Sequence, residues 1–75
     1  MTFVVLSSSK CKWCTKAMEL LENHRLDYEV KNVSTRPWLK TLMASSGLTT
    51  VPQIFRPDGE LIGGYDALKA YLGEG

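Results

Sequence analysis

Residues 7–21 of the chain read SSSKCKWCTKAMELL, and this stretch decides the fold. Just before it, residues 2–6 (TFVVL) form a short apolar, β-branched run that predicts a buried strand. After the serines, apolar side chains recur at helical spacing, at Cys14, Ala17, Met18 and Leu21. The stretch therefore predicts a strand, a turn and a helix, with Cys11 where the helix begins and Cys14 one turn further in.

A second strand and a second helix follow. Residues 27–33 alternate in polarity, which predicts a strand. The run from Ser34 to Pro37 is typical of a helix start, with a hydroxyl cap from Ser34 or Thr35 and a proline in the first turn, and Gly47 would end this helix. Its core-facing side chains are expected to be Trp38, Leu39, Leu42 and Met43.

The last part of the chain predicts a hairpin and a third helix. Residues 51–55 and 60–62 are short strands, joined by the turn RPDG at residues 56–59. Gly63 and Gly64 then lead into a helix whose inner side would carry Leu68, Tyr71 and Leu72.

The predicted order is β-α-β-α-β-β-α. The first βαβ unit requires a right-handed parallel crossover, and the last two strands pair antiparallel. We therefore expect an α/β fold, a four-stranded mixed sheet flanked by three helices, in a single domain over residues 1–75.

Composition narrows the class of function. A net charge of +1 gives no general attraction to nucleic acid or anionic lipid, so neither is an expected partner. No apolar run approaches the roughly 20 residues of a membrane span. The first nine residues lack the charged start and small-residue cleavage site of a signal peptide, so a cytoplasmic location is expected.

The cysteine pair indicates redox chemistry. Thiols are kept reduced in the cytoplasm, so one Cys-x-x-Cys there favours a catalytic or metal-binding role over a structural one. Side chains three apart on a helix lie about 5–6 Å apart, close to the distance a disulfide spans. Cys11 is the exposed member and is expected to attack, while Cys14 points inward and resolves. The helix start, with Lys10, Lys12 and Lys16 nearby, should lower the pKa of the Cys11 thiol.

A metal site within one chain is not expected. A structural zinc site takes four ligands, whereas the chain has two cysteines and one histidine. That histidine, His24, would lie about 20 Å along the helix axis from Cys11. A cluster shared between two chains stays open.

Three motifs together resemble the glutaredoxins of the thioredoxin superfamily. They are Cys-x-x-Cys at a helix start, TVPQIF at residues 50–55 and GGYD at residues 63–66, in the order of the family. The short length and the sequence PDGELIGGYDALKAYL at residues 57–72 are most similar to the small phage-type glutaredoxins. The resemblance implies a thioredoxin-like fold, a cis Val51–Pro52 bond, and glutathione as co-substrate with no tightly bound cofactor. It also implies disulfide-containing proteins as partners, ribonucleotide reductase among them, and we expect a monomer.

The same resemblance implies which residues contact substrate or glutathione: Lys10, Trp13, Lys40, Thr50, Val51, Pro52, Gly64, Tyr65 and Asp66. The chain departs from the family pattern at three places. Lys12 and Trp13 replace the usual Pro-Tyr between the cysteines, and Asp66 precedes the usual acidic position, which is Ala67. Ser8 stands where the family often has a basic residue, three positions before the first cysteine.

Two alternatives remain open from the sequence. One is a thioredoxin-like redoxin reduced by a flavoprotein reductase. The other, a non-enzyme, is an iron–sulfur carrier in which glutathione and Cys11 from two chains bridge a cluster.

Overall fold

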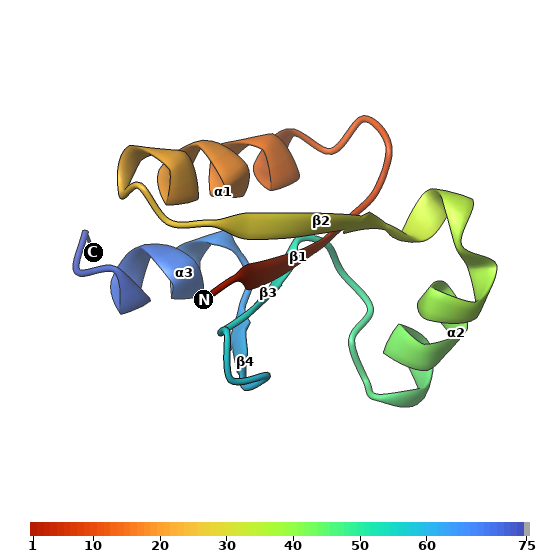
Figure 1. The fold of residues 1–75 in the computed structure, drawn as a ribbon. Coiled ribbons are helices and arrows are strands. Elements are labelled where there is room, and N and C mark those ends of the chain that lie inside the picture. Colours follow the sequence, from red (N-terminus) through yellow and green to blue (C-terminus); the bar gives the residue numbers. More distant parts are fainter. Residues whose placement is uncertain (75) are drawn as a thin grey trace.

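The four strands form one mixed sheet in a computed structural model that describes residues 1–74. Their order across the sheet is β2-β1-β3-β4, with β1 parallel to β2 and the other neighbours antiparallel (Figure 1). The strands are β1 (Phe3–Ser7), β2 (Tyr28–Asn32), β3 (Gln53–Phe55) and β4 (Leu61–Gly63). The predicted thioredoxin-like architecture, with its element order, is confirmed.

Side chains alternate across β1, so this central strand supplies both halves of the core. On one face, Phe3 and Val5 pack with α1 (Lys12–Asn23) and α3 (Tyr65–Tyr71). On the other face, Leu6 packs with α2 (Pro37–Ser45). Two helices therefore cover one face of the sheet and one covers the other.

The strand ends differ from the predicted ones by one or two residues. β3 begins at Gln53, not at Val51, because Pro52 has no N–H to donate to a ladder. β2 spans Tyr28–Asn32 instead of residues 27–33, since Val33 already belongs to a short 3₁₀ helix, η1 (Val33–Thr35).

The predicted start of the second helix is wrong in its cap. Ser34 and Thr35 lie in η1, and the residue before α2 is Arg36, whose side chain caps nothing. Asn32 caps η1 instead, accepting the N–H of Ser34. Pro37 stands in the first turn of α2, as predicted.

Three predicted core residues are exposed. In α2, Leu39 and Met43 are buried, whereas Trp38 and Leu42 are 63% and 55% exposed. A helix lying on one sheet face buries a single stripe, here the one that carries Leu39 and Met43, and Trp38 and Leu42 lie outside it. Tyr71 is likewise half exposed, with its ring edge against Phe3.

Within residues 1–74, no helix has both the length and the apolar character that crossing a membrane requires.

Candidate active site

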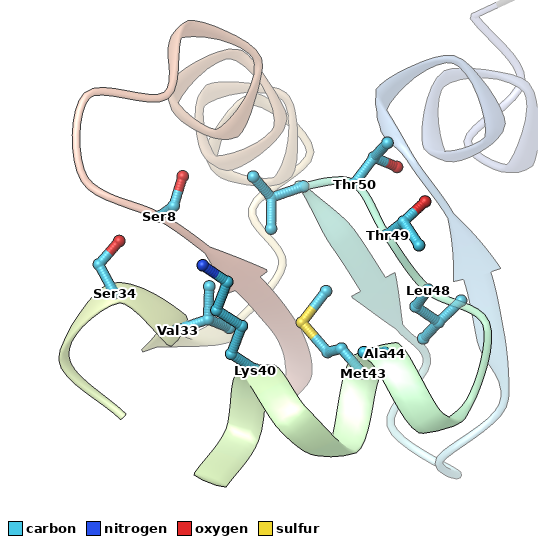
Figure 2. A pocket seen from close by; sticks show the side chains of 10 residues that line it. Ser8, Val33, Ser34, Lys40, Met43, Ala44, Leu48, Thr49 and Thr50 are labelled. Atoms are coloured by element: carbon cyan, nitrogen blue, oxygen red, sulfur yellow. The ribbon is translucent and has the colours of Figure 1, made fainter. Parts of the chain in front are cut away.

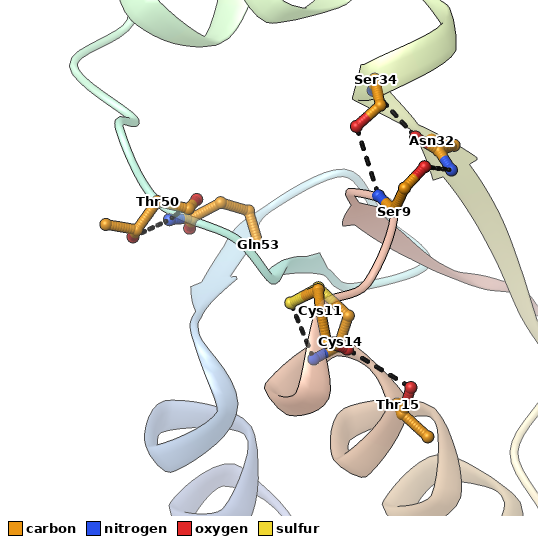
Figure 3. Close-up of a disulfide and its surroundings, with 8 residues drawn as sticks. All are labelled: Ser9, Cys11, Cys14, Thr15, Asn32, Ser34, Thr50 and Gln53. Atoms are coloured by element: carbon orange, nitrogen blue, oxygen red, sulfur yellow. Dashed lines mark hydrogen bonds between the residues drawn. A yellow bond between two sulfur atoms is a disulfide. The ribbon is translucent and has the colours of Figure 1, made fainter.

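Cys11 and Cys14 form a disulfide at the N-terminal end of α1 (Figure 3). Cys11 has extended backbone angles (φ −104°, ψ 107°) and is the N-cap residue of the helix. Its Sγ accepts the backbone N–H of Cys14 at 3.2 Å. The Cα atoms of the pair are 5.2 Å apart. The sulfur of Cys11 thus occupies the position where a helix stabilises negative charge.

The two sulfur-bearing residues differ in exposure. Cys14 is 1% exposed and belongs to the buried stripe of α1, whereas Cys11 is partly exposed. The carbonyl of Cys11 accepts the N–H and the hydroxyl of Thr15, at 3.2 and 3.3 Å, which closes the first turn of the helix. Because Cys14 is buried and Cys11 is partly exposed, only Cys11 can meet a large substrate in the folded chain.

Hydrogen bonds hold the loop before Cys11 to η1. The N–H of Ser9 donates to Ser34 Oγ at 3.2 Å, and Asn32 Nδ2 donates to Ser9 Oγ at 3.4 Å (Figure 3). Asn32 Oδ1 also accepts the N–H of Ser34 at 2.8 Å. Lys10 follows with a positive φ of 58°, so the chain turns sharply into the helix. Sequence reasoning missed this network, for which the only local signal is Asn32 two residues before a serine.

A groove of about 410 Å³ lies beside the disulfide end of the molecule. It is lined by Ala67 and by seven of the residues predicted to bind substrate or glutathione. The seven are Trp13, Thr50, Val51, Pro52, Gly64, Tyr65 and Asp66. The rings of Trp13 and Tyr65 lie 5.4 Å apart at a tilt of 42°, which joins the start of α1 to the start of α3. We call this space the first groove.

The Val51–Pro52 peptide bond, at the edge of the first groove, is cis, as predicted. Buried Gln53 holds the segment from behind: its Nε2 donates to the carbonyl of Thr50 at 3.0 Å and to its hydroxyl at 3.3 Å (Figure 3). Sequence reasoning missed this role of Gln53. Among residues 1–74, neither the N–H nor the carbonyl of Val51 has a hydrogen-bond partner.

The double glycine closes the other side of the first groove. Gly63 has a φ of 126°, and a Cβ there would lie 2.9 Å from the Cβ of Ala67. A Cβ on Gly64 would lie 3.6 Å from the carbonyl oxygen of Pro52, an ordinary contact distance. Gly63 is therefore required by the backbone, while Gly64 keeps the groove wide.

A second groove, of about 400 Å³, adjoins the first because Thr50 and Val51 line both. The amino group of Lys40 points into it from α2, on the side of Ser8 (Figure 2). Lys10 lines neither groove and is exposed at the turn before Cys11. The structure thus brings together all the predicted contact residues except Lys10.

Cations gather near the disulfide. The amino groups of Lys12 and Lys16 lie 6.0 and 5.8 Å from the ring centroid of Trp13, at the outer limit of a cation–π contact.

In the described part of the chain, no group of three or more His, Cys, Asp or Glu side chains could hold a metal ion.

Comparison with known proteins agrees with this geometry. The family model described as glutaredoxin matches residues 3–62. Glutaredoxin 1 of Rickettsia conorii is 39% identical over 70 residues, which span 89% of this chain and 68% of that protein. The glutaredoxin of Enterobacteria phage T4 is 32% identical over 74 residues, which span 84% of this chain and 85% of the phage protein.

A solved structure of a plant relative superposes closely on the chain. The crystal structure of the buckwheat glutaredoxin–glutathione complex matches with a TM-score of 0.79 at 26% identity. The superposition covers 96% of this chain and 70% of the buckwheat chain.

Proposed function

The chain belongs to the glutaredoxin family of thiol–disulfide oxidoreductases, and from this we propose that it uses glutathione to reduce protein disulfides and glutathione mixed disulfides. The observation that carries the proposal is the Cys11–Cys14 disulfide at the start of α1, beside a groove lined by the predicted glutathione contacts.

The chemistry begins with the reduced pair. The Cys11 thiolate attacks one sulfur of the substrate disulfide; that S–S bond breaks, a mixed disulfide with Cys11 forms, and the leaving thiolate takes up a proton. Cys14, as thiolate, then attacks Cys11 Sγ, which forms the Cys11–Cys14 bond and releases the second substrate thiol. Two electrons and two protons have passed to the substrate. Two glutathione molecules restore the dithiol and leave as glutathione disulfide.

The placement of the cysteines supports these roles. Attack requires the exposed sulfur, and Cys11 is the more exposed one, with its Sγ at a helix N-terminus, where negative charge is stabilised. Resolution requires a thiol that reaches Cys11 but avoids other partners. Buried Cys14 meets that requirement.

Glutathione would lie in the two adjoining grooves as an extended tripeptide. Its backbone would pair with the N–H and carbonyl of Val51, next to Thr50 and Pro52, in the manner of an added strand. The γ-glutamyl end would lie in the first groove against Gly64, Tyr65 and Asp66, with Trp13 as an aromatic wall. The glycyl carboxylate would meet Lys40 in the second groove, and Lys10 would add positive charge near the sulfur. The match to a relative solved with glutathione supports this placement.

We propose further that the protein acts as a cytoplasmic monomer with no tightly bound cofactor. Ribonucleotide reductase is the protein substrate that the family membership suggests.

One experiment separates glutathione from the alternative reductant. The protein is given a small neutral disulfide and NADPH, with either glutathione and glutathione reductase or a thioredoxin reductase alone. We expect rapid NADPH oxidation with the glutathione system and background oxidation with the other. Reduction by thioredoxin reductase with none by glutathione would overturn the proposal in favour of a thioredoxin-like redoxin.

A further inference from the structure

Exposed cations are concentrated at the end of the molecule that carries the disulfide. Lys10 directly precedes Cys11, and Lys12 and Lys16 belong to the first two turns of α1. Arg36 precedes α2, and Lys40 points into the second groove (Figure 2). All five side chains are exposed, and we call them the basic face: Lys10, Lys12, Lys16, Arg36 and Lys40.

Carboxylates are concentrated at the opposite end. This end comprises the C-terminal turn of α1, the start of β2, the β3–β4 turn and the residues after α3 (Figure 1). Its acidic residues are Glu22, Asp27, Asp58, Glu60 and Glu74. The cations there are partly neutralised, because Arg56 pairs with Asp58 and Glu60, and His24 pairs with Glu74. The five carboxylates of this end outnumber its cations Arg25, Arg56 and Lys69, so a net charge of +1 conceals an uneven distribution of charge.

The basic face has no such internal partners. Within residues 1–74, no carboxylate lies within ion-pair distance of its five side chains. Asp66 is the single described carboxylate that lines either groove. Among the described residues, the side chains beside Cys11 on α1 and those lining the two grooves therefore carry more positive than negative charge.

We propose that the basic face recognises acidic protein segments, so that the preferred substrates carry their disulfide or glutathionylated cysteine among Asp and Glu residues. The inference rests on the proposed function and specifies its substrate class. Opposite charge on the two partners raises the rate of productive encounter, and the effect weakens as salt screens it. The five cations are more numerous than the carboxylates of one glutathione need, which favours a larger anionic partner.

The test uses matched peptide disulfides that differ only in the residues flanking the cysteine: Asp and Glu, Asn and Gln, or Lys and Arg. The prereduced protein is mixed with each peptide in a single turnover without glutathione, so the reductant cannot bias the ranking. Each rate constant is divided by that for dithiothreitol, which corrects for intrinsic disulfide reactivity. At low ionic strength we expect the acidic peptide to react about tenfold faster than the basic one, the lower end of known steering effects.

Salt and charge variants locate the effect. Raising the ionic strength from about 0.01 to 1 M shortens the screening length from about 30 to 3 Å and should reduce the ratio towards one. Lys16→Gln with Arg36→Gln should lower the ratio at least about twofold. The control, Arg25→Gln with Lys69→Gln, removes the same charge away from the disulfide and should leave the ratio unchanged.

Failure of this inference is distinct from failure of the proposed function. Equal rates for all three peptides, a ratio that salt does not change, or equal effects of the two double variants would overturn the acidic-substrate inference. The glutathione-dependent turnover of a small neutral disulfide would stand in each of those cases. Loss of that turnover in the wild-type protein would overturn the proposed function itself.

Discussion

At the scale of the residue, Cys11 combines two positions that are usually filled by different groups. It is the N-cap of α1, a place that serine, threonine and aspartate normally take, and it is the exposed end of the disulfide. The cap interaction anchors its sulfur on the N–H of Cys14. Exchange chemistry at Cys11 and the start of the helix therefore depend on the same atom.

Substitution of each cysteine should give different products. In Cys11→Ser, disulfide reduction should fall to background while the fold is retained, because serine is a good N-cap residue. In Cys14→Ser, protein disulfides should accumulate as mixed disulfides on Cys11, and a fraction of the activity on glutathione mixed disulfides should remain. Mass spectrometry of the trapped species and urea unfolding of both variants measure the outcome. A Cys11→Ser variant that still reduces protein disulfides would contradict the assigned roles.

Tyr28 offers a test of a single hydrogen bond. Its hydroxyl donates to Glu22, and this bond, with some burial and the negative charge of Glu22, raises the pKa of Tyr28 above 10.0. The folded chain thus favours the protonated phenol. The resulting stabilisation is fully present below the ordinary tyrosine pKa and is lost as pH rises through the raised pKa.

We expect Glu22→Gln to lower the pKa of Tyr28 towards the ordinary value. Phenolate absorbance against pH, with Tyr28→Phe subtracted to isolate this tyrosine from the others, measures it. An unchanged titration midpoint would show that Glu22 does not control the phenol.

At the scale of the element, the link between β4 and α3 contains two adjacent glycines that differ in backbone angle and in the space around the Cα atom. Gly63 combines a positive φ with a Cβ position only 2.9 Å from the Cβ of Ala67. Gly64 has an ordinary φ of −85° and open contact distances. Strain and a steric clash are therefore confined to the first position.

Substitution of each glycine by alanine should have different effects on the free energy of unfolding. Gly63→Ala should lower the free energy of unfolding by about 1–3 kcal/mol, because the new Cβ meets the Cβ of a helix residue that cannot rotate away. Gly64→Ala should change it by less than about 0.5 kcal/mol. Urea unfolding of both variants compares them directly. Equal losses would mean that the backbone angle at Gly63 is not the controlling feature.

Much of the element order could be predicted because local patterns and tertiary packing agree. The change from an apolar, β-branched run to helical spacing located β1 and α1, and the TVP and double-glycine motifs located the first groove. The cap of α2 could not be predicted. The side chains of Ser34 and Thr35 could cap α2, but they are equally compatible with the short helix η1 in which they lie. Trp38 and Leu42 were predicted to be buried because spacing alone does not say how wide a stripe the sheet covers. The support of Thr50 by Gln53 arises from folding and has no sequence motif.

At the scale of the whole molecule, the two faces of the sheet differ in how firmly they are covered. α1 buries four side chains, Cys14, Ala17, Leu20 and Leu21. α2 buries two, Leu39 and Met43, and lies between the second groove and a further apolar cavity of about 380 Å³. The face that carries α2 is therefore the less tightly packed half of the core.

This difference should appear in amide hydrogen exchange. Amides of α2 should open at a lower free energy than those of α1 and β1, because fewer buried contacts are lost when α2 detaches. Native-state exchange at low denaturant concentration, read residue by residue by NMR, measures both helices in one sample. Equal protection of α1 and α2 would contradict the packing difference.

The sulfur cap of α1 has a consequence for the speed of electron transfer. In the proposed cycle, Cys11 Sγ is in turn a thiolate, half of a mixed disulfide and half of the internal disulfide, and in each form it keeps a lone pair for the N–H of Cys14. No backbone hydrogen bond of the helix has to break when the sulfur changes partner. The reorganisation of the helix that accompanies turnover is then small and local.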